Sequence, residues 1–81
     1  MGVVSLRIIV YDANQVPVNK AKVELTKRTL VATSTTDDKG VALFRLDAKL
    51  ERTTVTVWVN GKTTQNILVA DDKTFTVTYL K

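Results

Sequence analysis

The 81-residue sequence contains no cysteine and no histidine. The lack of cysteine excludes disulfide bonds and thiolate chemistry. The lack of histidine removes the side chain that most often acts as a general base at neutral pH and most often binds metal ions. Ser5 and Ser34 consequently have no imidazole to activate them as nucleophiles. We therefore expect a protein that is not an enzyme and that has neither a cofactor nor a metal site.

Glycine and proline are also scarce, with three glycines and a single proline, Pro17. Three isolated glycines cannot form a glycine-rich phosphate-binding loop. No apolar run approaches the roughly 20 residues that span a bilayer, so we expect no membrane insertion. The first residues, MGVVSLRIIVYD, lack the basic leader of a signal peptide. The chain is therefore expected to be either intracellular or a domain of a longer chain whose targeting signal lies elsewhere.

Charge of either sign is moderate and dispersed. Twelve Lys and Arg against eight Asp and Glu give a net charge of +4. Only Lys20/Lys22 and Lys27/Arg28 lie close together in the sequence. A dispersed excess of this kind mainly favours solubility, whereas a nucleic-acid-binding face requires a basic cluster. We therefore expect no nucleic-acid partner.

Valine and threonine are the commonest residues, and they occur in alternating patterns. Such β-branched residues favour strands. The apolar residues alternate along most of the chain, with a weaker pattern in TLVATSTT. We count seven short strand candidates, which turn signals separate at intervals of roughly 8–12 residues, and this spacing is typical of a β-sandwich. The alternation predicts these inward-facing residues: Val4, Leu6, Ile8, Val10, Ala21, Val23, Leu25, Ala42, Phe44, Leu46, Val55, Val57, Val59, Phe75, Val77 and Tyr79.

We predict that residues 1–81 form one all-β domain, a seven-stranded antiparallel β-sandwich with an immunoglobulin-like or transthyretin-like Greek key. A barrel built from the same strands is the alternative. The segment 41–46 is apolar at most positions of both faces, which predicts a strand that is covered on both sides. The first and last strands are long, and we expect their edges to be available for self-association.

Two turn signals are prominent. Asn60-Gly61 stands between alternating runs and predicts a two-residue hairpin turn, because both residues tolerate positive φ. Asp37-Asp38-Lys39-Gly40 has two interpretations: a tight turn, or a functional site in the form of a calcium site or a carboxylate pair. Adjacent carboxylates in an extended chain point apart, and the oxygen spacing of a calcium loop is missing, so we favour the turn. Asp71-Asp72 is interpreted in the same way.

Trp58 is the main candidate for a binding residue. It alternates with the inward valines and shares its face with Thr54 and Thr56. One interpretation is an aromatic platform for a sugar or a protein, because the indole ring offers a large stacking surface. The other is that Trp58 covers a sheet edge or packs under a loop, as half-buried tryptophans commonly do in small sandwiches. Threonine rows in turn are typical of solvated strand faces.

Four pieces of the sequence together resemble a known family. They are VYDANQVPVNKAKVEL, TDDKGVALFRL, the valine-rich strand that ends in VNG, and the closing VTYL. Their spacing resembles that of carboxypeptidase-regulatory-like domains, which are transthyretin-like (prealbumin-like) sandwiches related to bacterial and archaeal immunoglobulin-like surface repeats. The resemblance covers nearly the whole chain and implies a non-catalytic module.

From these observations we hypothesise a structural or accessory module of a longer extracellular or cell-envelope protein, acting as a spacer or interaction domain. Its partners would be neighbouring domains or another protein. The second hypothesis is a binding module for a polysaccharide or a protein, which uses Trp58, Thr54 and Thr56.

Overall fold

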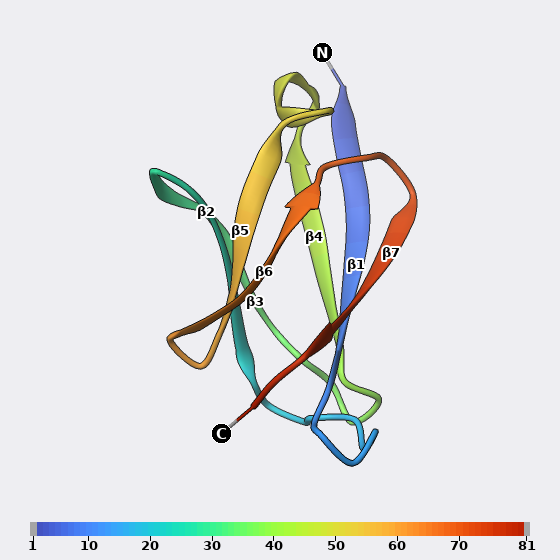
Figure 1. Ribbon diagram of the computed structural model, residues 1–81. Coiled ribbons are helices and arrows are strands. Elements are labelled where there is room, and N and C mark those ends of the chain that lie inside the picture. The colour runs from blue at the N-terminus through green and yellow to red at the C-terminus, as the bar shows by residue number, and fades with distance from the viewer. Residues whose placement is uncertain (1, 81) are drawn as a thin grey trace.

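The structure is a computed structural model that describes residues 2–80. This part of the chain folds into two β-sheets that face each other (Figure 1). One sheet has three strands in the order β4-β1-β7, and the other has four in the order β3-β2-β5-β6. The strands are β1 (Val3–Tyr11), β2 (Lys22–Lys27), β3 (Thr29–Thr35), β4 (Val41–Asp47), β5 (Thr54–Val59), β6 (Lys62–Leu68) and β7 (Lys73–Thr78), with a short 3-10 helix, η1 (Ala48–Leu50), between β4 and β5.

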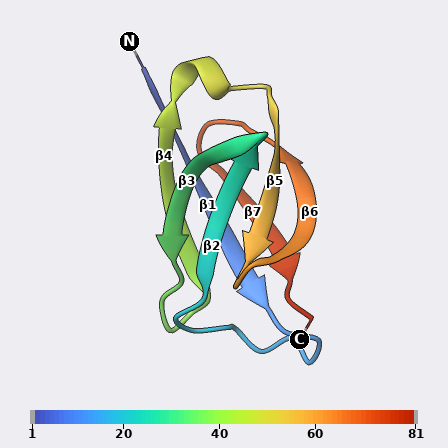
Figure 2. The ribbon, with the colours of Figure 1, turned by 90° about the vertical axis from the view of Figure 1, so that its left-hand side faces the viewer.

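The core lies between the two sheets, as the alternation of the sequence predicts. Side chains of successive strand residues point to opposite faces, so that one apolar residue in two enters the core. Ile8 on β1 and Leu25 on β2 are fully buried. Phe75 and Tyr79 are partly buried and pack against the core cluster. Figure 2 shows the four-stranded sheet in front of β4, β1 and β7. The two sheets confirm a sandwich-like arrangement rather than a barrel.

One strand pair contradicts the expectation of a fully antiparallel sandwich. β1 pairs with β4 in antiparallel orientation but with β7 in parallel orientation, from Leu6 opposite Lys73 to Tyr11 opposite Thr78. Antiparallel pairing is imposed on two strands only when a short turn joins them. The first and last strands are joined through all the others, so no turn dictates their relative direction.

Two further expectations are wrong for related reasons. β1 is not an edge strand, because it lies between β4 and β7, whereas β7 does lie at the edge of its sheet as expected. β4 is not covered on both sides, since Leu43 on its outer face is 64% exposed. A strand with two apolar faces is covered twice only where further elements lie over the sheet. Within residues 2–80 nothing is placed over the outer face of β4, and no helix there is long and apolar enough to cross a membrane.

Both predicted turns form. Asn60 and Gly61 have φ values of 49° and 82° and join β5 to β6 directly, which confirms the hairpin turn. Gly40 has a φ of 79° and ends the turn before β4. Gly40 is buried where this turn meets β1, and its carbonyl accepts a hydrogen bond from the Val10 amide at 2.8 Å. A Cβ at position 40 would lie 2.6 Å from the Val10 carbonyl oxygen, whereas a Cβ at position 61 would meet nothing within 4 Å.

These two glycines form a matched pair for a stability test. Gly61→Ala adds only the strain of a left-handed backbone and is expected to cost about 1 kcal/mol. Gly40→Ala adds the same strain and a clash with main-chain atoms, which is expected to cost about 2 kcal/mol more. Urea denaturation of both variants gives the two free energies of unfolding. Equal losses in the two variants would show that the contact between Gly40 and Val10 is loose.

Candidate binding surfaces

The outer face of the four-stranded sheet carries the residues that the sequence singled out. Thr54, Thr56 and Trp58 on β5 point away from the core, while the valines between them are buried. Trp58 lies opposite Glu24 on β2 and Thr63 on β6. Thr56 lies opposite Thr26 and Asn66 on the same two strands. The pairing of β2, β5 and β6 therefore surrounds the indole ring with polar side chains from three strands.

Hydrogen bonds order this face. The Trp58 Nε1 atom donates to the Thr26 hydroxyl at 2.8 Å, and the Thr56 hydroxyl donates to Asn66 Oδ1 at 2.8 Å. The strand pairing shifts register next to both residues of this indole hydrogen bond. The pairing of β2 with β3 shifts between Leu25 and Thr26, and that of β5 with β6 shifts between Val57 and Trp58. Such irregularities bend a strand and re-aim side chains. The result is a half-buried indole whose Nε1 atom is held by a side chain of the neighbouring strand β2.

The charge of this face is small. Within residues 2–80, one ion pair forms, between Lys22 Nζ and Glu24 Oε2 at 3.9 Å. The Lys22 side chain is 64% exposed, so the pair adds little to stability. A face with one tied aromatic ring, several hydroxyls and almost no net charge suits neutral polar ligands better than highly charged ones.

The acidic turns use their carboxylates to hold backbone. Asp37 Oδ1 accepts hydrogen bonds from the amides of Lys39 at 2.9 Å and Val41 at 3.0 Å. Asp12 does the same in the loop after β1, where its Oδ1 accepts from Asn14 and Val16. These contacts confirm the turn interpretation of residues 37–40. Residues 2–80 contain no group of three or more acidic side chains arranged to hold a metal ion.

Asp71 and Asp72 form the turn between β6 and β7, and both contact β1. Asp71 Oδ1 accepts a hydrogen bond from the Ser5 amide at 2.9 Å. The Asp72 amide donates to the Ser5 carbonyl at 2.6 Å, and Asp72 has a φ of 55°. This turn therefore aligns the start of β7 with β1, which is a structural role that the sequence pattern alone did not reveal.

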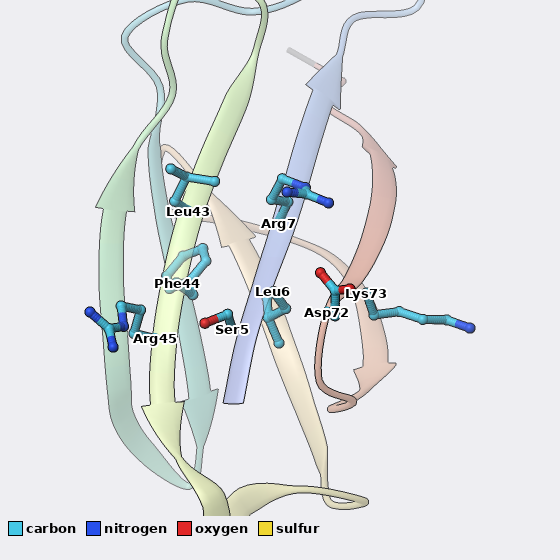
Figure 3. Close-up of a pocket in the computed structure, with 8 residues that line it drawn as sticks. All are labelled: Ser5, Leu6, Arg7, Leu43, Phe44, Arg45, Asp72 and Lys73. Atoms are coloured by element: carbon cyan, nitrogen blue, oxygen red, sulfur yellow. The ribbon is translucent and has the colours of Figure 1, made fainter. Parts of the chain in front are cut away.

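A hollow on the opposite sheet was not predicted. It has a volume of about 200 Å³ and lies over β1 and β4 beside the start of β7 (Figure 3). The hollow is lined by the small side chain of Ser5 and by the larger side chains of Arg7, Leu43 and Arg45. The two guanidinium groups point to opposite sides in Figure 3, and Arg7 Nε donates to the Thr74 hydroxyl at 3.2 Å. The arginines therefore do not converge on a common anion.

One feature of the sequence is related to this hollow. Arg7 and Arg45 both fall on outward positions of their predicted strands. Their proximity depends on the pairing of β1 with β4, in which Ser5 lies opposite Arg45 and Arg7 lies opposite Leu43. These strands are separated by two others in the sequence, and alternation does not specify partners across such a distance.

Comparison with known proteins finds similarity at the level of the fold. No protein-family model matches the sequence, and a search of curated proteins finds no relative. Among solved structures, the fold is similar to part of the Bacillus anthracis TIE protein, with a TM-score of 0.64 and 20% sequence identity. The match covers 96% of this chain and 16% of that chain. At this identity the likeness establishes the fold alone, a small all-β domain with two sheets.

The Asp37 turn makes stability depend on pH. Hydrogen bonds from the Val41 and Lys39 amides, together with the nearby Lys39 charge, hold the pKa of Asp37 below its ordinary value. The folded state therefore prefers the charged carboxylate. The contribution of this carboxylate to the free energy of unfolding is complete above the pKa of the unfolded state, which is about 4. The contribution is lost as the pH falls through the lowered pKa.

Asp37→Asn keeps an acceptor in place but removes this titration. The stability advantage of the wild type over Asp37→Asn is expected to be constant near neutral pH and to shrink as the solution becomes more acidic than about pH 4. Urea denaturation of both proteins at a series of pH values measures the difference. A difference that stays constant down to about pH 2 would contradict the proposed role of the charged carboxylate.

Proposed function

We propose that this chain is a non-catalytic β-sandwich module of a longer cell-surface or secreted protein, in which it acts as a spacer or interaction domain. The observation that supports this most is the direction of the first and last strands. β1 and β7 run in parallel, and Tyr11 near the end of β1 lies opposite Thr78 at the end of β7. A chain that enters through β1 and leaves through β7 therefore passes from one pole of the domain to the other (Figure 1).

The dimensions agree with such a role. The domain measures 39 × 23 × 16 Å, and the nine residues of β1 extend about 27 Å, so that its strands follow the long axis. Domains attached at the two poles would lie in line and would not compete for the same surface. At the exit pole, Leu80 is 64% exposed and Val16 is 52% exposed, which provides apolar surface for contact with a following domain.

The comparison with the TIE protein is compatible with a modular role, since the similar domain there is 16% of a longer chain. We further propose that the sandwich is of the transthyretin-like or immunoglobulin-like Greek-key type. Support comes from the motifs that suggested the resemblance: Asp12 and Asp37 each begin a hydrogen-bonded turn at the end of a strand. The tally of seven strands in residues 2–80 agrees with it as well.

The spacer function can be tested by energy transfer. A donor fused after β7 and an acceptor fused before β1 should be far apart, whereas an acceptor inserted in the Asn60-Gly61 turn should be near the donor. This turn belongs to the exit pole, because Asn60 Oδ1 accepts a hydrogen bond from the Lys22 amide, next to Ala21 and Thr36. We expect weaker energy transfer when the acceptor is fused before β1 than when it is inserted in the turn. Both fusions should keep the unfolding midpoint of the unmodified domain. Equal transfer in both, or a fusion that unfolds the domain, would contradict the proposal.

The alternative is a binding module for a polysaccharide or a protein, and the tied indole of Trp58 favours it. A ring held by its Nε1 bond to Thr26 loses little freedom when a ligand stacks on it. Trp58→Ala should then abolish binding to immobilised neutral glycans, and Trp58→Phe should retain part of it. Thr74→Ala, on the outer face of the other sheet, is the control and should bind as the wild type does. Binding that survives Trp58→Ala would exclude this face.

A further inference from the structure

We propose that the paired strands β1 and β7 form a mechanical clamp, so that a force pulling the two ends of the domain apart is resisted by the whole ladder between them. This inference rests on the proposed function as a spacer, because only a module with neighbours on both sides is pulled at both ends. It adds a property that spacing does not require, namely resistance to extension.

The geometry of the ladder is the first argument. Six residue pairs join the strands, from Leu6 opposite Lys73 to Tyr11 opposite Thr78. A pull on the start of β1 and the end of β7 draws two parallel strands past each other along their length. Hydrogen bonds of a parallel ladder are evenly spaced between the strands, so such a shear loads all of them at once. In an antiparallel pair the same two ends lie side by side, and a pull would break the bonds one after another.

Contacts at both ends of the ladder extend it. At the entry pole, the Ser5 amide donates a hydrogen bond to Asp71 Oδ1 at 2.9 Å, and the Ser5 carbonyl accepts one from the Asp72 amide at 2.6 Å. At the exit pole, the Tyr79 amide donates to the Tyr11 carbonyl at 2.8 Å. These bonds lie outside the six pairs, so the connection between β1 and β7 runs from one pole nearly to the other.

The position of β1 is the second argument. β4 holds its other side through seven pairs, from Val3 opposite Asp47 to Ile9 opposite Val41. The inward side chains of β1 are buried, with Leu6 at 2% and Ile8 at 0% exposure. A pull on the start of β1 therefore cannot peel this strand from the sheet before the ladder to β7 has been loaded. The force path uses β1 and β7 directly and bypasses the strands of the other sheet.

The test compares two pulling directions on the same ladder. Single cysteines can be placed as attachment points without background, because the chain has none. Gly2→Cys combined with Thr78→Cys attaches handles at opposite poles and shears the ladder. Gly2→Cys combined with Lys73→Cys attaches both handles at the entry pole and opens the ladder from one end. Gly2, Lys73 and Thr78 are exposed, and a Cβ at position 2 makes only an ordinary contact of 3.4 Å with Ala48.

Single-molecule pulling on the full chain is expected to give a rupture force several-fold higher for the opposite-pole pair than for the same-pole pair. Urea denaturation should give both double variants similar free energies of unfolding, so that the difference in force reflects direction. Forced unfolding reports the unfolding rate along the pulled direction rather than equilibrium stability. Equal rupture forces in the two directions would overturn the proposal.

A point variant gives a second, independent test. Asp71→Ala removes the acceptor of the Ser5 amide and is expected to lower the opposite-pole rupture force. Asp38→Ala, in the turn before β4, is the control and should leave that force unchanged. Equal effects of the two variants would overturn the clamp. A chain that is weak in every direction, yet separates its fused reporters in the energy-transfer experiment, would overturn the clamp and leave the spacer function standing.

Discussion

The parallel pairing of β1 with β7 is the constraint on which the rest of the structure depends. It places the first and last strands side by side in one sheet, and β4 completes that sheet on the other side of β1. Because the two strands share a direction, the chain enters at one pole and leaves at the other. The turn at Asp71 and Asp72 holds this alignment through Ser5. The long axis and the positions of the two ends follow from this one pairing.

A second constraint joins the sheets at the exit pole. The buried Thr36 hydroxyl donates a hydrogen bond to the Val18 carbonyl and accepts one from the Ala21 amide. The Val18 amide in turn donates to the Val10 carbonyl. Gly40 fits against the same carbonyl of Val10, where no side chain has room. The β1–β2 loop and the β3–β4 loop thus meet at Val10, near the end of β1. Asp37, which the sequence offered as a calcium ligand, and Asp12 both accept hydrogen bonds from backbone amides and so hold the turns in which they lie.

The two outer faces differ in what they offer. The four-stranded sheet presents a tied indole among hydroxyl and amide groups, with little net charge. The three-stranded sheet presents a shallow hollow over Ser5, with an exposed Leu43 and two arginines that diverge. The first face has ordered groups for a neutral ligand, whereas the second lacks convergent ones. A spacer with one such face could also serve as an interaction domain, so the two proposed functions do not compete for the same residues.

The sequence by itself determined what depends on neighbouring residues. Alternation is set by the backbone, so Leu6, Ile8 and Val57 could be assigned to the core, and Trp58 to the opposite face of its strand. Asn60-Gly61 and Asp37–Gly40 specify their turns through their own backbone preferences. Only the tertiary structure decided which strands pair and in which direction, which face of β4 is covered, and that Thr26 holds the indole. These features join residues distant in sequence, and their choice depends on the free energy of the whole chain rather than on any local pattern.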